Sequence, residues 1–375
     1  MKCELFKKTA KINIQKISLL RRTKLKKPQT FLDQIDILRK EKFTNPNSLV
    51  LPNSEIKPGI LSSPPKYAHL NVTNRCNSNC TYCIHAANRK PILSQNDANT
   101  EKMKSVLQQI VDLGIESVNF SGGEPLLRPD IFELIHFSEQ IGLVSILLSN
   151  GLLLPKYWQE LGKTGNHYLI LSIDTLDPEL FKKQRGVSFK AEWKGFESAL
   201  KLRDRFPDYV INITATVTKS NLEELPNLVE RFSSYGVGIE FSPLHDLGAE
   251  LKESNVPLDI VLVQKKISEL IEMRASGYLI LNSDEYLLHF PKFFHNPSQL
   301  PESYICRCAN QCLYIDATLN IKPCWSQTFP IVGNLENESL QEIWFSPYFE
   351  EQRKRVNQLD CDRCWLLCTA EPSLR

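Results

Sequence analysis

Short apolar runs rich in β-branched residues alternate with helical segments six times in the middle of the chain. Each run is separated from the next by a stretch with helical periodicity or with helix-start signals. Repeated βα units imply a parallel sheet with right-handed crossovers, and six units suit an incomplete (βα)6 barrel better than a closed barrel of eight. The sequence therefore predicts an α/β fold whose ligands bind at the carboxyl ends of the strands. The predicted strands are 67–73, 117–121, 144–149, 168–173, 210–217 and 237–241.

The 11 cysteines are more informative by their grouping than by their number. Apart from Cys3, predicted to be an incidental thiol, they form two tight groups, one directly after the first predicted strand and one near the C-terminus. The odd total, the clustering and the lack of a secretory apolar run argue for metal ligation and against disulfides. The first group is Cys76, Cys80 and Cys83, and the second is Cys306, Cys308, Cys312, Cys324, Cys361, Cys364 and Cys368.

The first group has the spacing C-x3-C-x2-C immediately behind a strand. Three closely spaced thiolates can surround one compact metal centre. Structural zinc normally takes four protein ligands, whereas a 4Fe-4S cluster held by three cysteines leaves one iron open for an exogenous chelating ligand. The spacing therefore favours a cluster with a bound cofactor. His85, two residues further on, keeps a four-ligand zinc site open as the alternative.

This segment resembles the radical S-adenosylmethionine enzymes, whose defining motif is C-x3-C-x-aromatic-C after the first barrel strand. Tyr82 occupies the aromatic position. The resemblance implies that S-adenosylmethionine chelates the open iron through its amino and carboxylate groups. It also implies that the reduced cluster cleaves this cofactor to methionine and a 5′-deoxyadenosyl radical, which takes a hydrogen atom from the substrate. The cofactor carries the difficult step, and the protein supplies orientation and excludes water.

Three further segments match the family at the ends of later strands. A Gly-Gly-Glu motif follows the second strand, and the resemblance implies that it receives the methionine ammonium of the cofactor. A Ser-Asn-Gly segment ends the third strand on the implied ribose side, with a plain polar turn as the alternative. Ser-Ile-Asp ends the fourth strand, and an arginine after it is suited to the cofactor's carboxylate, unless it is an ordinary surface residue. The implied cofactor-binding residues are Tyr82, Gly122, Gly123, Glu124, Ser149, Asn150, Ser172 and Arg185.

The second cysteine group resembles the C-terminal extension called SPASM, or its shorter relative called twitch, found in radical enzymes with auxiliary 4Fe-4S clusters. Cys306 and Cys324 flank a predicted hairpin, and a C-x2-C pair follows at Cys361 and Cys364. The resemblance implies one auxiliary cluster held by these four cysteines. A zinc-ribbon-like knuckle is the alternative for the whole group.

The other three cysteines of this group leave the number of auxiliary clusters open. A full SPASM pattern ends with a further distant cysteine, whereas only seven residues follow Cys368. A second auxiliary cluster would need Cys308, Cys312, Cys368 and one more ligand, so we predict a single auxiliary cluster. Cys308 or Cys312 could also replace Cys306 as a ligand. Any of the three that is not a ligand is a candidate thiol hydrogen donor.

Charge is unevenly distributed along the chain. The first 66 residues hold 15 lysines and arginines against 5 acidic residues, although the formal net charge of the whole chain is only +2. We interpret residues 1–66 as a basic arm, partly disordered or packed on the barrel; docking of an acidic peptide is another reading. Nucleic acid is disfavoured because no aromatic residues are interleaved. The most apolar stretch, 141–154, is too short to span a membrane, and a cytoplasmic protein is expected.

The predicted organisation is an arm at 1–66, a radical barrel at 67–245, a helical linker at 246–300 and an auxiliary-cluster domain at 301–375. The predicted function is hydrogen abstraction from an unactivated carbon of a ribosomally synthesised peptide, leading to a crosslink, an oxidation or an epimerisation. An electron donor such as flavodoxin or ferredoxin is the expected partner. The alternatives are a dehydrogenase or epimerase of a small molecule such as a sugar alcohol, and a non-catalytic zinc or iron-sulfur protein. The sequence names no general base.

Overall fold

The computed structural model describes residues 33–34, 64–83, 97–166, 168–245, 259–296, 299–302, 304–326, 328–361 and 363–374. His85, most of the basic arm and residues 246–258 of the predicted linker lie outside the described residues. None of the helices within the described ranges combines the length and the apolar character needed to cross a membrane.

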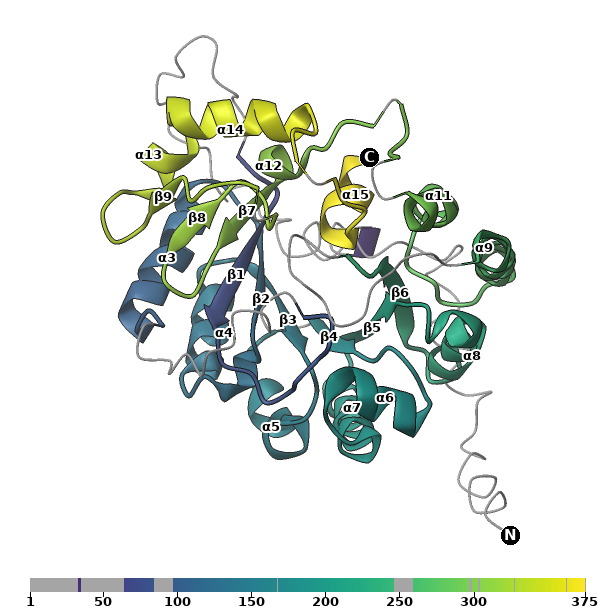
Figure 1. The fold of residues 1–375 in the computed structure, drawn as a ribbon. Coiled ribbons are helices and arrows are strands. Elements are labelled where there is room, and N and C mark those ends of the chain that lie inside the picture. The colour runs from purple at the N-terminus through teal and green to yellow at the C-terminus, as the bar shows by residue number, and fades with distance from the viewer. Residues whose placement is uncertain are drawn as a thin grey trace.

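A curved sheet of six parallel strands lies at the centre of the molecule (Figure 1). Each strand pairs with the next one in the chain, and β6 forms one edge of the sheet. The sheet is therefore an open barrel, as predicted, and every predicted strand lies within two residues of an observed one. The strands are β1 (Tyr67–Thr73), β2 (Ser117–Gly122), β3 (Val144–Ser149), β4 (Tyr168–Ser172), β5 (Val210–Val217) and β6 (Gly238–Pro243).

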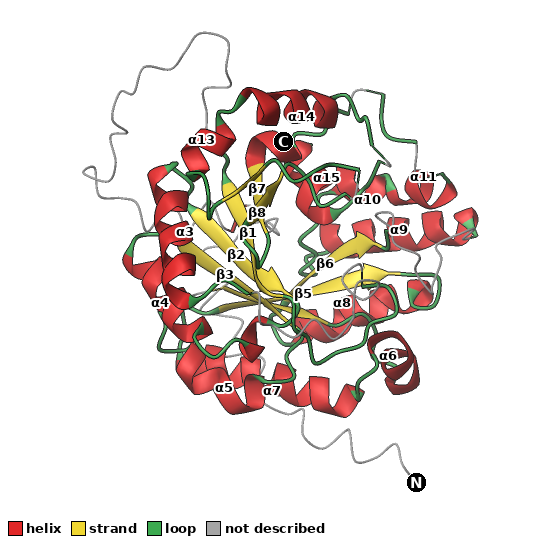
Figure 2. Cartoon of the chain, turned by 60° about the vertical axis from the view of Figure 1, so that its left-hand side comes forward, coloured by secondary structure: helices red, strands yellow, loops and turns green. Residues whose placement is uncertain are grey.

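Helices cover the outer face of this sheet (Figure 2). In the first of them, Met103, Leu107 and Ile110 recur at helical spacing and are fully buried in the same core as Leu70 and Val72 of β1. The two periodicities, 3.6 on the helix and 2 on the strand, thus meet in one apolar layer. The elements of this ring are α3 (Thr100–Asp112), η2 (Pro125–Leu127), α4 (Ile131–Gln140), α5 (Leu154–Leu161), α6 (Pro178–Arg185), α7 (Phe189–Arg205), η3 (Leu222–Glu224) and α8 (Leu225–Ser234).

Three C-terminal strands extend the barrel sheet. β7 (Cys312–Ile315) pairs in parallel with β1, and β8 (Asn320–Lys322) and β9 (Gly333–Asn334) follow in antiparallel order, so the predicted hairpin is present. The sequence did not indicate that this hairpin joins the barrel. A six-stranded open barrel leaves the N–H and C=O groups at the β1 edge without strand partners, and β7 supplies those partners.

The last helix closes the gap between the two sides of the open barrel. The hydroxyl of Tyr67 on β1 donates to the carbonyl oxygen of Cys368 at 2.8 Å, and the N–H of Leu367 donates to Ser242 Oγ on β6 at 3.5 Å. α15 therefore lies between β7 and β6 (Figure 2). The helices of this region are α9 (Ile260–Ala275), α10 (Asp284–Leu288), α11 (Phe290–His295), α12 (Cys308–Gln311), α13 (Leu340–Trp344), α14 (Pro347–Asn357) and α15 (Leu367–Ser373).

Candidate active site

The loop that carries the first cysteine group leaves the carboxyl end of β1 and rests on the end of α6. The N–H groups of Asn79 and Thr81 donate to the carbonyl oxygens of Arg185 and Gln184 at 3.0 and 2.8 Å. Gly186 ends α6 at a φ of +69°, and a Cβ there would lie 2.9 Å from the Cβ of Asn79. The last carbonyl groups of the helix, which have no partners within it, therefore hold the cysteine loop.

The two glycines of the Gly-Gly-Glu motif clamp the same loop from the β2 side. The N–H groups of Gly123 and Glu124 donate to the carbonyl oxygens of Thr73 and Arg75 at 2.8 and 2.7 Å. A Cβ at Gly122, whose φ is +122°, would lie 2.3 Å from the Thr73 oxygen, and one at Gly123 would lie 2.0 Å from the Arg75 oxygen. Glycine is required here because the protein's own backbone approaches too closely for any side chain.

The carboxylate of Glu124 is almost fully buried and joins the segment after β2 to the end of β3. Oε1 accepts from the N–H of Leu126 at 3.1 Å and from Ser149 Oγ at 2.9 Å, and Oε2 accepts from the N–H of Asn150 at 2.8 Å. Burial raises the pKa of Glu124 to about 7, although the three donors oppose that rise. The side-chain nitrogen of Asn150 lies 3.9 Å from the sulfur of Cys76. This set therefore positions the cysteine loop.

A second polar cluster forms behind the cysteine loop at the end of β4. The buried carboxylate of Asp174 accepts from Arg185 Nε at 2.5 Å, from the hydroxyl of Tyr82, and from the N–H of Thr216 at 2.7 Å. Burial opposes the charge of Arg185, but the Asp174 carboxylate outweighs it and holds the pKa of the guanidinium well above its ordinary value. Arg185 is thus a fixed cation beside Cys80, whose own pKa is raised by burial.

A cavity of about 490 Å³ extends from the cysteine loop into the barrel interior. Its wall is built from inward-facing residues of β1 to β6 on one side and from α15 on the other. The predicted site residues on this wall are Cys80, Tyr82, Cys83, Ser172, Arg185 and Cys368. The other predicted cofactor-binding residues, Gly122, Gly123, Glu124, Ser149 and Asn150, lie behind the cysteine loop and do not line the cavity.

Several residues at this site were not predicted from the sequence. Asp174 organises Tyr82 and Arg185, yet in sequence it is one more carboxylate after a strand. Glu240 and Glu371 line the cavity and are both buried. Glu240 does leave a usable trace, because an acidic residue in the middle of an apolar strand rarely occurs without a purpose.

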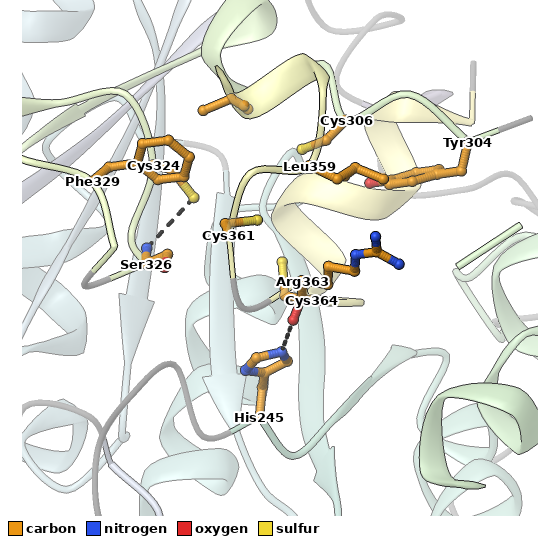
Figure 3. Close-up of a pocket in the computed structure, with 11 residues that line it drawn as sticks. His245, Tyr304, Cys306, Cys324, Ser326, Phe329, Leu359, Cys361, Arg363 and Cys364 are labelled. Atoms are coloured by element: carbon orange, nitrogen blue, oxygen red, sulfur yellow. Dashed lines mark hydrogen bonds between the residues drawn. The ribbon is translucent and has the colours of Figure 1, made fainter. Parts of the chain in front are cut away.

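The second cysteine group builds a separate, smaller site. Cys306, Cys324, Cys361 and Cys364 line one cavity of about 20 Å³ and come from three segments of the chain (Figure 3). They are the four cysteines that the resemblance implies as ligands of one auxiliary cluster. His245 lines this cavity and also the larger one, and its Nε2 lies 2.7 Å from the carbonyl oxygen of Arg363. The two cavities are therefore neighbours.

The three other cysteines of the second group do not line the small cavity. The sulfur atoms of Cys306 and Cys308 share a hydrogen bond at 3.5 Å, and this interaction lowers the pKa of the Cys306 thiol, which favours the thiolate form that metals bind. Cys312 is fully buried on β7 beside Tyr67 and Tyr314. Of Cys306, Cys308 and Cys312, only Cys306 lines the small cavity, so Cys306 is the better candidate ligand.

The donor sets of both sites fit iron-sulfur chemistry. None of the ten cysteines within the described ranges forms a disulfide. Three stand on the loop after β1 and four surround the small cavity, and sulfur is the ligand that iron-sulfur clusters take. In the part of the chain that the structure describes, no three His, Cys, Asp or Glu side chains converge on a single point tightly enough to hold one metal ion.

Two family models match the chain. The model of the radical SAM superfamily matches residues 70–232, and the model of SPASM, an iron-sulfur cluster-binding domain, matches residues 306–365. The chain is therefore a member of the radical SAM superfamily. Within that superfamily it belongs to the enzymes with a C-terminal SPASM-type domain, so it is an enzyme that uses S-adenosylmethionine, a 4Fe-4S cluster and auxiliary iron-sulfur.

Known proteins resemble the chain in two ways. A probable GTP 3',8-cyclase of Methanococcus maripaludis is 29% identical over 222 residues, which cover 58% of this chain and 72% of the relative. The structure of Streptococcus suis SuiB bound to precursor peptide SuiA superposes with a TM-score of 0.64 at 19% identity, covering 91% of this chain and 83% of SuiB. Native anSMEcpe with bound AdoMet has a TM-score of 0.60 at 18% identity, covering 78% and 84%. These structures establish the fold.

Proposed function

We propose that this radical SAM enzyme modifies a peptide by taking a hydrogen atom from an unactivated C–H bond held in the 490 Å³ cavity. When bound, the reduced cluster and S-adenosylmethionine supply the 5′-deoxyadenosyl radical for that step. Cys76, Cys80 and Cys83 are the proposed cluster ligands. An electron donor such as flavodoxin or ferredoxin would reduce the cluster, and the product would be a crosslinked, oxidised or epimerised residue.

The placement of the cavity carries this proposal. Its lining includes Cys80 and Cys83 of the cysteine loop as well as Cys368 and Trp325 of the C-terminal region. A substrate in it would lie between the proposed radical-generating cluster and the proposed auxiliary cluster. His245 lines both cavities, so the electron that a substrate radical loses on oxidation would have a short route to the auxiliary site.

The remaining proposed roles follow from the polar clusters. Arg185 and Ser172 face the cavity beside the cysteine loop, where a carboxylate of the cofactor would find a fixed cation. Tyr82 is held by Asp174 and keeps the loop packed against β4. Glu124 acts mainly as a positioning residue, because its carboxylate already accepts three hydrogen bonds from the protein. Cys306, Cys324, Cys361 and Cys364 are the proposed auxiliary ligands.

The charge of the cavity favours a peptide over a nucleotide. The relatives named GTP 3',8-cyclase act on a substrate with a triphosphate, and such a substrate needs cations. The lining of this cavity includes two cationic side chains, Lys66 and Arg185, and Arg185 is paired with Asp174 and proposed for the cofactor's carboxylate. The acidic side chains of Glu240 and Glu371 offer acceptors to the same space, which a triphosphate, itself an acceptor, cannot use. The likeness to SuiB, solved with a precursor peptide, extends over 91% of the chain and supports a peptide substrate.

The experiment compares the two substrate classes directly. The full-length protein is reconstituted anaerobically with iron and sulfide, reduced, and given S-adenosylmethionine with either GTP or deuterated versions of the short peptides encoded next to its gene. The expected result is deuterium in 5′-deoxyadenosine together with a mass change in one peptide. A 3',8-cyclised product formed from GTP, with every peptide unchanged, would overturn the proposal.

A further inference from the structure

Two buried carboxylates, one on β6 and one on α15, line the large cavity. Glu240 lies on β6 and is 4% exposed, and Glu371 lies on α15 and is 5% exposed. Both residues line the cavity, so each carboxylate is shielded from bulk water but adjacent to the space where a substrate would bind. Burying two like charges side by side is costly unless something compensates them.

No described residue balances the negative charge of the Glu240 carboxylate. Its Oε2 is buried without a hydrogen-bond partner there, and Glu240 forms no ion pair within the described ranges. In the neighbouring Glu371, Oε1 accepts a hydrogen bond from the N–H of Ser283 at 3.0 Å. Burial and the charge of Glu371 together raise the pKa of Glu240 to about 8, which is the behaviour of a carboxyl group that lacks a cation.

A second orphaned acceptor lies on the same wall. Asn119 on β2 is 7% exposed, and its side-chain oxygen is buried without a partner in the part of the chain that the structure describes. Its side-chain nitrogen lies 3.2 Å from His69 Nδ1, so the oxygen is left to face the cavity. Two carboxylates and an amide oxygen therefore offer acceptors to one space. Acceptors of this kind match a group that carries positive charge and several N–H donors.

We propose that Glu240, together with Glu371, forms a subsite for a cationic group of the substrate, either a primary ammonium or a guanidinium. This inference rests on the proposed function, and on a peptide it selects a lysine or arginine side chain at or next to the modified residue. The subsite also explains why the barrel retains an acidic residue in the middle of β6, where an apolar one would pack at no electrostatic cost.

The test uses small probes and measures binding, so it is independent of turnover. The reconstituted full-length protein is titrated calorimetrically with N-acetyl-lysine methylamide and N-acetyl-arginine methylamide. Norleucine and citrulline derivatives serve as the uncharged counterparts. We expect at least one cationic probe to bind about tenfold more tightly than its counterpart, as a charge-assisted hydrogen bond provides. Comparing the lysine probe with the arginine probe shows whether the subsite prefers an ammonium or a guanidinium group.

Glu240→Gln keeps the size of the side chain and should remove this preference, whereas Glu230→Gln, at an exposed position on α8, should keep it. Glu371→Gln gives a second variant, expected to weaken the preference, if Glu240→Gln does not fold. Equal binding of charged and uncharged probes, or an unchanged preference in a folded Glu240→Gln protein, overturns the subsite. Preferential binding of a cationic probe by an enzyme that leaves every peptide unmodified upholds the subsite and rejects the peptide reaction.

Discussion

Glu124 and Asn150 connect two motifs that are separated in the sequence: the Asn150 backbone N–H donates to Glu124 Oε2 at 2.8 Å. The side-chain amide of the same asparagine donates to Asn77 Oδ1 at 2.7 Å and to Ser78 Oγ at 3.1 Å, both within the cysteine loop. A chain of hydrogen bonds therefore runs from the Gly-Gly-Glu motif through the end of β3 to the loop that holds Cys76.

Replacing Glu124 tests whether this chain of bonds or a direct contact with the cofactor matters more. Glu124→Ala leaves three donors without their acceptor, two of them backbone groups, and we expect a loss of about 1–3 kcal/mol in unfolding free energy. We also expect slower 5′-deoxyadenosine formation with iron retained, and a smaller effect in Glu124→Gln. Chemical denaturation and a chromatographic assay measure both quantities. A variant as stable as the wild type that binds S-adenosylmethionine weakly would instead place the carboxylate on the cofactor.

The cysteines after β1 should be needed for cofactor cleavage but not for iron binding at the auxiliary site. Changing Cys76, Cys80 or Cys83 to Ala is expected to abolish reductive formation of 5′-deoxyadenosine and to lower iron by about four atoms per chain, because one 4Fe-4S cluster loses a ligand. Iron at the auxiliary site should remain. Cys308→Ser is the matched control and should cleave the cofactor normally. Undiminished cleavage in the triple variant would exclude these ligands.

The iron content tests the C-terminal site. Anaerobic reconstitution should give about eight iron and eight sulfide per chain if one auxiliary cluster accompanies the first. Replacing any one of Cys306, Cys324, Cys361 and Cys364 by Ala should remove about half of the iron, whereas Cys312→Ser should keep it. About twelve iron per chain would require a second auxiliary cluster, and about four iron with zinc present would show a zinc-binding knuckle instead.

Replacing Cys368 distinguishes a mechanism in which the substrate radical loses an electron from one in which a thiol donates a hydrogen atom to it. Its thiol faces the large cavity, whereas Cys308 and Cys312 face neither cavity. For a crosslink or an oxidation, Cys368→Ser should leave product formation largely intact, and Cys364→Ala should stop turnover but allow uncoupled 5′-deoxyadenosine formation. Mass spectrometry of the peptide measures product formation in each variant. A Cys368→Ser protein with full iron that forms 5′-deoxyadenosine without product would identify a thiol hydrogen donor and an epimerisation.

Glu240 should make the apoprotein less stable as pH rises. Burial raises its pKa to about 8 from the ordinary value of 4.5, with Glu371 on α15 adding to the rise. Tyr168 on β4 is also electrostatically coupled to Glu240. The folded state binds the proton more tightly, so this contribution to stability is complete below pH 4.5 and is lost progressively up to about pH 8.

The measurement is a comparison of denaturant unfolding at several pH values. Relative to Glu240→Gln, the wild type should lose up to about 4 kcal/mol of unfolding free energy across that range, as an upper bound. Exposed Glu230→Gln is the control and should follow the wild type. Parallel curves for the wild type and Glu240→Gln would show that Glu240 ionises as freely in the folded protein as in the unfolded one.

The sequence alone was enough to predict the barrel and to nominate the chemistry. Six apolar runs in alternation with helices define the strands, because strand and helix periodicities are local properties of the chain. The spacing of Cys76, Cys80 and Cys83 is equally local, since ligands of one compact centre must lie close along one loop. The pairing of Cys306 with Cys324 around a hairpin and the Cys361–Cys364 pair are short-range patterns as well.

Only the tertiary structure decided which residues share a cavity. Glu240 and Glu371 are 131 positions apart, and nothing local to either residue indicates that β6 and α15 line the same cavity. The same holds for Asp174, which joins Arg185 to Tyr82, and for β7, which pairs with β1 because the barrel leaves that edge open. Long-range packing sets these contacts: burial and charge depend on everything that surrounds a side chain, and the sequence order around it does not record those neighbours.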